Sequence, residues 1–143
     1  MVYEKYEKEK YTISTDPDST DIEAVHMMLS KSYWAQTRPR EIIEISIKNS
    51  LCFNLFDGTK QIGFARVVTD YAVFAYLCDI YIDENYRKSG LGKWMLQCIL
   101  SSSALKNVKR ILLATKDAHE FYKKFGFTAL EDPNKYMVLS KEK

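Results

Sequence analysis

The feature that most constrains the fold is a junction near the middle of the chain, where an apolar segment gives way to a glycine-containing one. Residues 74–82 are rich in aromatic and β-branched side chains, which favours a β-strand. Two glycines lie in the basic segment that follows, Arg87-Lys88-Ser89-Gly90-Leu91-Gly92-Lys93, and apolar residues then recur at helical spacing up to Ile99. The chain is therefore expected to pass from a strand into an amphipathic helix through a short turn.

The segments on either side of this junction predict a mixed α+β domain. Residues 52–56 and 61–69 have the composition of strands, and Asp57-Gly58 between them favours a hairpin turn, so that with residues 74–82 they form an antiparallel meander. The other expected strands are residues 11–14, 110–115 and 136–140, and the other expected helices are residues 22–31, 39–49 and 118–125. The isoleucine-rich segment after Pro39 also fits a strand.

Short patterns predict where two of the helices begin and where one ends. Thr20 followed by Glu23 has the spacing of a capping box, and so has Asp117 followed by Glu120. Gly126 stands where the residue after the end of the later helix belongs.

Length and composition limit the classes of protein to which the chain can belong. A chain of 143 residues with 46% hydrophobic and 28% charged residues is expected to fold as one domain, residues 1–143. Its formal net charge of +2 gives no broad positive field, so we expect no binding of nucleic acid. No apolar run approaches the roughly 18 residues of a membrane span, and residues 1–10 lack the apolar core of a signal peptide. We therefore expect a cytoplasmic protein that does not bind membranes.

Cysteine and histidine are too sparse to predict a disulfide framework or a metal site. Cys52, Cys78 and Cys98 are far apart in apolar surroundings and lack CxxC spacing, so we expect reduced thiols in the core. His26 and His119 are widely separated, and we expect no bound metal.

The glycine turn has the chemistry of an anion-binding site. Glycine lets the backbone approach a bulky ligand, and the first N–H groups of a helix have no acceptor within it. These groups and the positive end of the helix dipole attract negative charge. Arg87, Lys88 and Lys93 add positive charge where it opposes the dipole by roughly 0.3–1 kcal/mol each, which indicates that a bound anion compensates. A plain strand-to-helix turn with solvated lysines is the alternative.

The segment from Ile80 to Gly92 resembles the signature of the Gcn5-related N-acetyltransferase (GNAT) superfamily, R/Q-x-x-G-x-G/A. Arg87, Gly90 and Gly92 match its three specified positions. The resemblance implies that acetyl-CoA is the co-substrate, with its pyrophosphate on the amides of the turn and its pantetheine arm hydrogen-bonded to the preceding strand. The residues that it assigns to coenzyme binding are Ile80, Tyr81, Ile82, Arg87, Lys88, Ser89, Gly90, Leu91, Gly92, Lys93 and Tyr122.

A second stretch strengthens the resemblance, because Ala118, Tyr122, Gly126 and Phe127 match the family pattern A-x-x-x-Y-x-x-x-G-F. The resemblance places Tyr122 near the coenzyme sulfur, where its hydroxyl protonates the departing thiolate. Thr115 replaces an asparagine that the family often has three residues before the alanine. The implied fold is a central, mostly antiparallel sheet of about six to seven strands flanked by about four helices, in a monomer or homodimer.

The implied reaction is direct transfer of an acetyl group from acetyl-CoA to a primary amine of a small molecule or peptide. A backbone amide near Ile82 is expected to stabilise the oxyanion, and a base removes a proton from the amine. The candidate bases are Asp79 and Tyr76, followed by Asp70 and Cys78. Strand alternation predicts that one face of the strand holds Tyr76, Cys78, Ile80 and Ile82 and the other holds Leu77, Asp79 and Tyr81.

Asp79 has two interpretations. Burial inside the apolar segment 74–82 would favour a role as proton acceptor. Alternatively, the side chain faces outward or pairs with Arg66 as a buried carboxylate, and then it takes no part in the chemistry.

The acceptor is expected to bind the variable N-terminal half of the fold, where residues 32–40 combine aromatic side chains with two arginines. A pocket for an anionic or aromatic acceptor is predicted from Tyr33, Trp34, Arg38, Arg66 and Tyr71. Tyr33 and Trp34 can equally serve only to pack the junction between two helices. A noncatalytic acyl-CoA-binding module of the same fold is the alternative to an enzyme.

Overall fold

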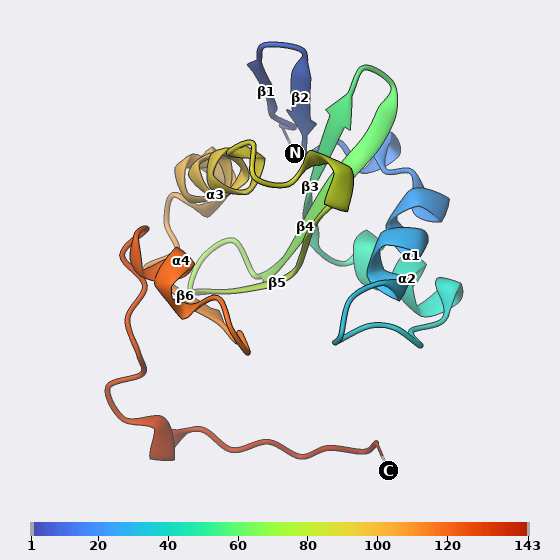
Figure 1. The fold of residues 1–143 in the computed structure, drawn as a ribbon. Coiled ribbons are helices and arrows are strands. Elements are labelled where there is room, and N and C mark those ends of the chain that lie inside the picture. Colours follow the sequence, from blue (N-terminus) through green and yellow to red (C-terminus); the bar gives the residue numbers. More distant parts are fainter. Residues whose placement is uncertain (1, 143) are drawn as a thin grey trace.

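The computed structural model describes residues 2–142 and shows a six-stranded sheet flanked by helices (Figure 1). The strands follow one another across the sheet in chain order, and neighbours are antiparallel except β5 and β6, which are parallel. Their bounds are β1 Lys5–Lys8, β2 Tyr11–Ser14, β3 Leu51–Asp57, β4 Lys60–Thr69, β5 Phe74–Ile82 and β6 Arg110–Leu113. The predicted α+β class and mostly antiparallel sheet are confirmed. The sequence pattern does not predict β1, because all its residues but one are charged.

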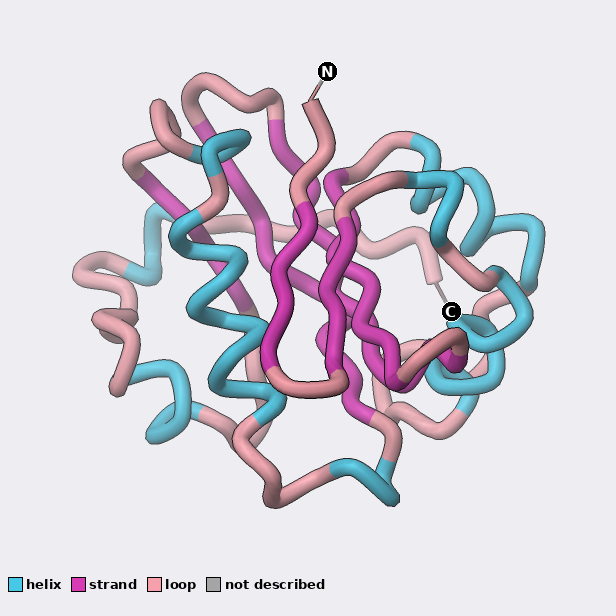
Figure 2. The backbone as a smooth tube through the Cα atoms, turned by 90° about the horizontal axis from the view of Figure 1, so that it is seen from above, coloured by secondary structure: helices cyan, strands magenta, loops and turns pink. Residues whose placement is uncertain are grey.

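Four α-helices lie against this sheet in the described chain: α1 Ile22–Ser30, α2 Arg40–Lys48, α3 Leu91–Ser101 and α4 His119–Lys123. Seen from above, α1 and α2 lie on one side of the strands and α3 lies on the other (Figure 2). Short 3-10 turns join several elements: η1 Pro17–Ser19, η2 Glu84–Tyr86, η3 Ser103–Leu105 and η4 Pro133–Lys135.

Each face of the sheet carries its own apolar core. On one face, Met95 of α3 packs with Phe53 of β3. On the other face, Leu29 of α1 and Ile43 of α2 pack with Phe64 of β4. All five side chains are buried, and burial of each contributes about 1.5–3 kcal/mol. The sheet is therefore held from both sides, which fixes the backbone of its central strands.

The first helix begins one residue later than the capping-box pattern predicted. Asp21 is its N-cap, and the Asp21 carboxylate accepts a hydrogen bond from the N–H of Ala24 at 3.1 Å. The hydroxyl of Thr20 instead accepts a hydrogen bond from the side chain of Asn54 at 2.9 Å. The prediction of a cap at Thr20 is wrong because that side chain is bonded to the sheet.

The isoleucine-rich segment after Pro39 forms a helix, not a strand. Pro39 is the N-cap of α2, and its fixed φ suits the start of a helix. Ile43 and Ile47 lie about one turn apart and are buried, whereas Ile42 and Ile45 are 50% and 57% exposed. Burial on one side at this spacing is typical of an amphipathic helix on a sheet.

An extra residue in β5 changes which of its side chains face each core. Phe64 of β4 pairs with Tyr81, but Arg66 pairs with Cys78. Between these two pairs β5 therefore advances by three residues while β4 advances by two. Asp79, in the bulged region, has a φ of 52°, a left-handed conformation. The regular alternation predicted for β5 is therefore wrong beyond Cys78.

The bulge has two consequences for β5. Leu77 before it and Ile80 and Ile82 after it pack against the same core, on the α3 side, whereas Tyr81 is buried on the side of α1 and α2. Pairing with β6 also ends at Leu77, which lies opposite Leu113. Within residues 2–142, residues 78–82 thus have no strand partner on that edge.

The short helix α4 lacks the predicted capping box. Its N-cap is Ala118, and the N–H of Ala118 donates a hydrogen bond to the hydroxyl of Thr115 at 3.0 Å. Gly126 has a φ of 96°, and the N–H of Phe127 reaches back to the carbonyl of Tyr122 at 3.3 Å. Gly126 has the left-handed conformation expected after a helix, but the helix itself ends at Lys123, two residues before the predicted end, and its predicted cap at Asp117 is wrong.

The strand predicted at residues 136–140 is also wrong for the single chain. These residues belong to no strand of the described chain, and Met137, Val138 and Leu139 are 97%, 91% and 85% exposed. Figure 1 shows this segment, in red, extended away from β6. A strand needs a neighbouring backbone for its N–H and C=O groups, and strand composition alone does not supply one.

Candidate active site

The predicted glycine turn lies between η2 and α3, just beyond β5. Gly90 is the N-cap of α3, with a φ of 83°, and no side chain caps this helix start. The first hydrogen bond of the helix runs from the N–H of Trp94 to the carbonyl of Gly90 at 3.0 Å. The N–H groups of residues 91–93 precede this bond and have no acceptor within the helix. With the helix dipole they create a positive potential in front of α3.

A cavity of about 280 Å³ opens at this helix start. It is lined by Ile82, Tyr86, Arg87, Lys88, Gly90, Leu91, Gly92, Lys93 and Phe121. A methyl group added to Gly92 would lie 3.8 Å from the ring of Phe121, an ordinary contact distance. The structure thus gathers the basic residues and both glycines of the turn around one hollow.

Some of the residues predicted to bind the coenzyme make contacts within the protein. Arg87 Nε donates a hydrogen bond to the carbonyl of Ile82 at 2.8 Å, and the Arg87 guanidinium lies 4.9 Å from the ring centre of Tyr81. The hydroxyl of Ser89 donates to the carbonyl of Tyr86 at 2.6 Å. Arg87 and Ser89 therefore stabilise the turn itself, and Tyr81 lies behind it, on the side of α1 and α2.

A larger cavity, of about 530 Å³, lies where β5 and β6 separate. Its walls come from β4 and β5, from β6 and α4 with the loop between them, and from the loop between α1 and α2. The lining residues are Tyr33, Trp34, Arg38, Arg66, Tyr76, Leu77, Cys78, Asp79, Ile80, Leu113, Ala114, Thr115, Lys116, Asp117, Ala118 and Tyr122. Phe121 lines the smaller cavity and its neighbour Tyr122 the larger one, so the two cavities adjoin at α4.

Aromatic contacts hold Tyr122 in the wall of the larger cavity. Its ring meets the rings of Phe121 and Phe127 edge-on, with centroids 5.2 Å and 5.8 Å away. Burial raises the pKa of Tyr122 to about 12, and the neighbouring Tyr33 adds a smaller effect. The phenol therefore keeps its proton at neutral pH and can donate it to an anion formed in the cavity.

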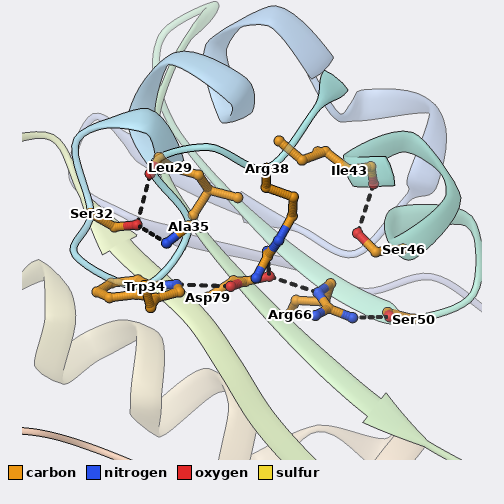
Figure 3. Close-up of polar contacts among 10 residues, drawn as sticks. All are labelled: Leu29, Ser32, Trp34, Ala35, Arg38, Ile43, Ser46, Ser50, Arg66 and Asp79. Atoms are coloured by element: carbon orange, nitrogen blue, oxygen red, sulfur yellow. Dashed lines mark hydrogen bonds and ion pairs between the residues drawn. The ribbon is translucent and has the colours of Figure 1, made fainter. Parts of the chain in front are cut away.

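The opposite wall is built around the carboxylate of Asp79, on which three side chains converge (Figure 3). Trp34 Nε1 donates to Oδ1 at 2.9 Å, and Arg38 Nη1 and Arg66 Nε both donate to Oδ2 at 2.8 Å. Arg66 Nη1 also donates to the hydroxyl of Ser50 at 3.1 Å. The pairing with Arg66 favours the second interpretation of Asp79, since a proton taken from an amine would displace one of these donors.

The loop between α1 and α2 is ordered by its own hydrogen bonds and reaches across the cavity. The hydroxyl of Ser32 donates to the carbonyl of Leu29 at 2.7 Å and accepts from the N–H of Ala35 at 3.0 Å. The hydroxyl of Tyr33 accepts a hydrogen bond from the N–H of Lys116 at 3.1 Å. This contact joins the N-terminal half of the chain to the loop after β6.

The other predicted site residues divide between the cavity and its surroundings. Tyr76 and Cys78 line the larger cavity, and burial raises the pKa of Cys78 to about 11, so its thiol is neutral at physiological pH. Tyr71 packs against the core on the α3 side, outside the cavity lining. Asp70 Oδ1 accepts hydrogen bonds from the N–H groups of residues 72–74, which orders the loop between β4 and β5.

The loop after β6 forms part of the cavity wall, which no pattern in the sequence predicts. Lys116 and Asp117 both line the cavity, whereas the sequence pattern predicts Asp117 only as a helix cap. The signal that points to them is the parallel pairing of β5 and β6, because ligands bind beyond the carboxyl ends of parallel strands. That pairing is not visible in the sequence.

Comparison with known proteins decides the family. Residues 48–129, more than half of the chain, match the model of the GNAT acetyltransferase domain. This chain belongs to the GNAT acetyltransferase family. The matched region contains both the glycine turn and the α4 motif, and acetyl transfer is the activity of the family.

Individual acetyltransferases are similar to this chain over most of its length. A proposed acetyltransferase of Gibberella zeae is 31% identical, in an alignment that covers 81% of this chain and 78% of that one. The solved structure of a proposed GNAT acetyltransferase from Xanthomonas campestris is 36% identical, with a TM-score of 0.88 over 91% of this chain and 92% of that one. The chain also spans 58% of an uncharacterised N-acetyltransferase of Pyropia yezoensis, at 31% identity over 103 residues.

Two more distant solved structures share the fold. The ribosomal-protein-S18-alanine N-acetyltransferase of Escherichia coli is 22% identical, with a TM-score of 0.69 over 82% of this chain and 77% of that one. The glucosamine-6-phosphate N-acetyltransferase of Arabidopsis thaliana is 13% identical, with a TM-score of 0.66 over 94% and 99%. The family matches together show that the protein is an N-acetyltransferase.

Between residues 2 and 142, the helices are all too short or too polar to cross a bilayer. In the same part of the chain, no group of three or more His, Cys, Asp and Glu side chains is arranged to hold a metal ion.

Proposed function

We propose that this GNAT protein moves the acetyl group of acetyl-CoA to a primary amine of a small molecule or peptide by direct attack, with no covalent enzyme intermediate. One observation carries the proposal: the uncapped start of α3, with its basic residues, and the cavity of Tyr122 adjoin along the unpaired edge of β5. The names of the two distant structural neighbours refer to a protein alanine and to an amino sugar phosphate. The fold thus suits acceptors of either size.

The residues at the start of α3 fit the donor. The N–H groups of residues 91–93 and the ammonium groups of Lys88 and Lys93 complement a pyrophosphate. The pantetheine arm carries amide groups, and these can bond to the open edge of residues 78–82 as an added strand would.

In this reaction an N–C bond forms as the C–S bond of the thioester breaks, the amine nitrogen loses a proton, and the departing thiolate gains one. A backbone N–H of β5 near Ile82 stabilises the negative charge that develops on the carbonyl oxygen. Tyr122, whose pKa is raised to about 12, donates the proton to the sulfur.

Removal of the amine proton falls to the β5 wall of the cavity. Tyr76 lines this wall and can relay the proton to water. Asp79 accepts three hydrogen bonds and serves to position Arg38 and Arg66.

Unfolding measured with and without acetyl-CoA tests the donor site. At about one hundred times the dissociation constant, the ligand should stabilise the fold by about 2.7 kcal/mol. The variant Lys88→Gln/Lys93→Gln should lose most of this gain, while Lys106→Gln/Lys109→Gln, with the same change of charge away from the turn, should keep it. No stabilisation of the wild type by acetyl-CoA or by longer acyl-CoAs would contradict the proposal.

A further inference from the structure

Two arginines in the larger cavity share a single carboxylate. Arg38 and Arg66 both donate to Oδ2 of Asp79 at 2.8 Å. The side chain of Asp79 is 3% exposed, and those of Arg38 and Arg66 are 24% and 15% exposed. Two positive groups and one negative group leave a formal charge of +1 in this wall. A largely buried charge without a counter-ion is unfavourable, so the wall favours a bound anion.

The two guanidinium groups also retain unused donors, since each carries several N–H groups. Among the described residues, Arg38 bonds through one nitrogen to Asp79, and Arg66 bonds through two, to Asp79 and Ser50. None of their other nitrogens is a buried atom without a partner, so these nitrogens are accessible. Both side chains line the cavity, and paired N–H groups that face a cavity match the oxygens of a carboxylate.

The excess charge is confined to this side of the cavity. On the facing wall, Lys116 and Asp117 offset one another, and Tyr122 is neutral at physiological pH. A cavity of about 530 Å³ has the size of a small-molecule site. A ligand that bridges the walls therefore meets positive charge at one end and the acid of the proposed reaction at the other.

We infer that the acceptor is a small molecule that carries a carboxylate as well as its primary amine. The carboxylate binds the free N–H groups of Arg38 and Arg66, and the amine lies towards Tyr122. This inference rests on the proposed acetyl transfer and names the acceptor class for the same site.

Matched acceptors test the inference. A panel of α-amino acids, ω-amino acids and aminobenzoates is compared with the corresponding carboxamides, which differ only in the charge of one group. For at least one pair, kcat/KM of the acid should exceed that of the carboxamide by about tenfold or more. Equal values for every pair, or binding of acetyl-CoA without acetylation of any acid, overturn the inference. A protein that does not bind acetyl-CoA instead contradicts the proposed function, by a separate measurement.

Variants locate the preference. Arg38→Gln should lower the acid-to-carboxamide ratio by about tenfold while acetyl-CoA affinity is unchanged, and Arg38→Lys should give an intermediate ratio. Arg40→Gln is the matched control, because Arg40 pairs with Glu23 and Glu44 outside the cavity. An unchanged ratio in both Arg38 variants overturns the inference.

The segment of residues 136–140 supports a second, independent inference. It has strand composition, yet Met137, Val138 and Leu139 are almost fully exposed. An unbroken apolar run in water is unfavourable and marks a contact surface.

The strand β6 offers a matching edge. It is the last strand of the sheet, and in the described chain it pairs only with β5. Ile111, Leu112 and Leu113 are each only half-buried. An open edge of apolar residues is a template for another strand.

The geometry disfavours pairing of these two segments within one chain. The ring of Tyr136 lies 5.6 Å from the guanidinium of Arg110, the first residue of β6. An antiparallel partner would instead have to start beside Leu113, at the other end of β6. From Tyr136 the chain continues away from its own sheet (Figure 1).

We propose that residues 136–140 of one copy form an antiparallel strand on β6 of a second copy, and that the second copy does the same in return. Such an exchange gives a closed two-fold dimer in which neither apolar segment is exposed. It does not depend on the acetyl-transfer proposal.

Light scattering after gel filtration and hydrogen exchange together test the exchange. The wild type should have twice the chain mass, with slow exchange of the N–H groups of residues 137–139. Val138→Pro removes one of these donors and should give a folded monomer, while Glu131→Pro, outside the segment, should remain a dimer. A wild-type monomer overturns the proposal, whether or not those N–H groups are protected, and so does a Val138→Pro dimer.

Discussion

The turn before α3 and the cluster around Asp79 both adjoin β5, but they are built in opposite ways. The turn consists of consecutive residues, and the N–H groups of residues 91–93 have no helical acceptor. The cluster brings Trp34, Arg38 and Arg66 from separate parts of the chain, and both oxygens of its carboxylate are bonded inside the protein.

This difference indicates what each region contributes. Bonds that are complete within the protein stabilise the fold, whereas donors without partners contribute little until a ligand arrives. Changes to the Asp79 carboxylate should therefore act first on stability, and changes in the turn should act first on ligand binding.

The largest effect is expected from Asp79→Asn, which leaves two guanidinium groups facing each other without their carboxylate. Asparagine tolerates the left-handed conformation at this position, so the change tests charge and not backbone strain. We expect a loss of about 3–5 kcal/mol in the free energy of unfolding, measured by urea denaturation. Glu23→Gln, which breaks the exposed pair with Arg40, should lose less than about 1 kcal/mol. Equal losses in the two variants would show that the cluster is no more important to the fold than a surface pair.

The same contrast explains how much of the molecule the sequence predicts. The turn of residues 87–93 and the meander of β3 to β5 depend on near neighbours, so their composition and spacing predict them. The bulge at Asp79 depends on the register between β4 and β5, which no local pattern contains. The predicted alternation of side chains therefore fails at the bulge, and the prediction that Leu77 lies on the same face as Tyr81 is wrong.

The site shows the same limit. Pairing with Arg66 belongs to one of the two interpretations of Asp79 that the sequence allows. Trp34 and Arg38 also bond to that carboxylate, although they lie 45 and 41 residues away from Asp79 in the chain. Residues 136–140 have the composition of a strand, yet whether they form one depends on a partner backbone.

Tyr122 lies where the two regions meet, and Tyr122→Phe should separate catalysis from binding. If Tyr122 donates the proton to the thiolate, kcat should fall about a hundredfold, while the dissociation constant for acetyl-CoA stays the same. Thiol release and calorimetry measure these quantities, with the exposed Tyr3→Phe as the control. An unchanged kcat would remove Tyr122 from the mechanism, and a wild type that binds acetyl-CoA but acetylates no amine would favour the noncatalytic module.

A smaller and more selective effect is expected from Gly92→Ala in the turn. The added methyl group has room beside Phe121, and alanine favours a helix over glycine by about 1 kcal/mol, so stability should be equal or slightly higher. The methyl group also enters the smaller cavity, and the affinity for acetyl-CoA should fall about tenfold. Gly58 has a φ of 61° in the β3–β4 hairpin. Gly58→Ala should therefore have the opposite pattern of effects: it should lower stability by about 1–2 kcal/mol and leave the affinity for acetyl-CoA unchanged. Full affinity in Gly92→Ala would show that the ligand does not approach this helix start.

Cys78 provides the mildest probe, because it neighbours Asp79 in the chain and lines the larger cavity. Burial raises the pKa of the Cys78 thiol to about 11. The rate of its alkylation by iodoacetamide should therefore rise about tenfold per pH unit up to about pH 11, whereas the rate for an exposed thiol would level off near pH 9. Cys52 and Cys98 are buried and should react only as the protein unfolds. Cys78→Ser should therefore abolish the alkylation that occurs in the folded protein. A carboxylate-bearing acceptor in the cavity should slow labelling of Cys78, whereas Lys88→Gln/Lys93→Gln at the turn should leave the unliganded rate unchanged. If that variant alters the unliganded rate, the two regions are coupled through β5 and the contrast between them is weaker than their contacts indicate.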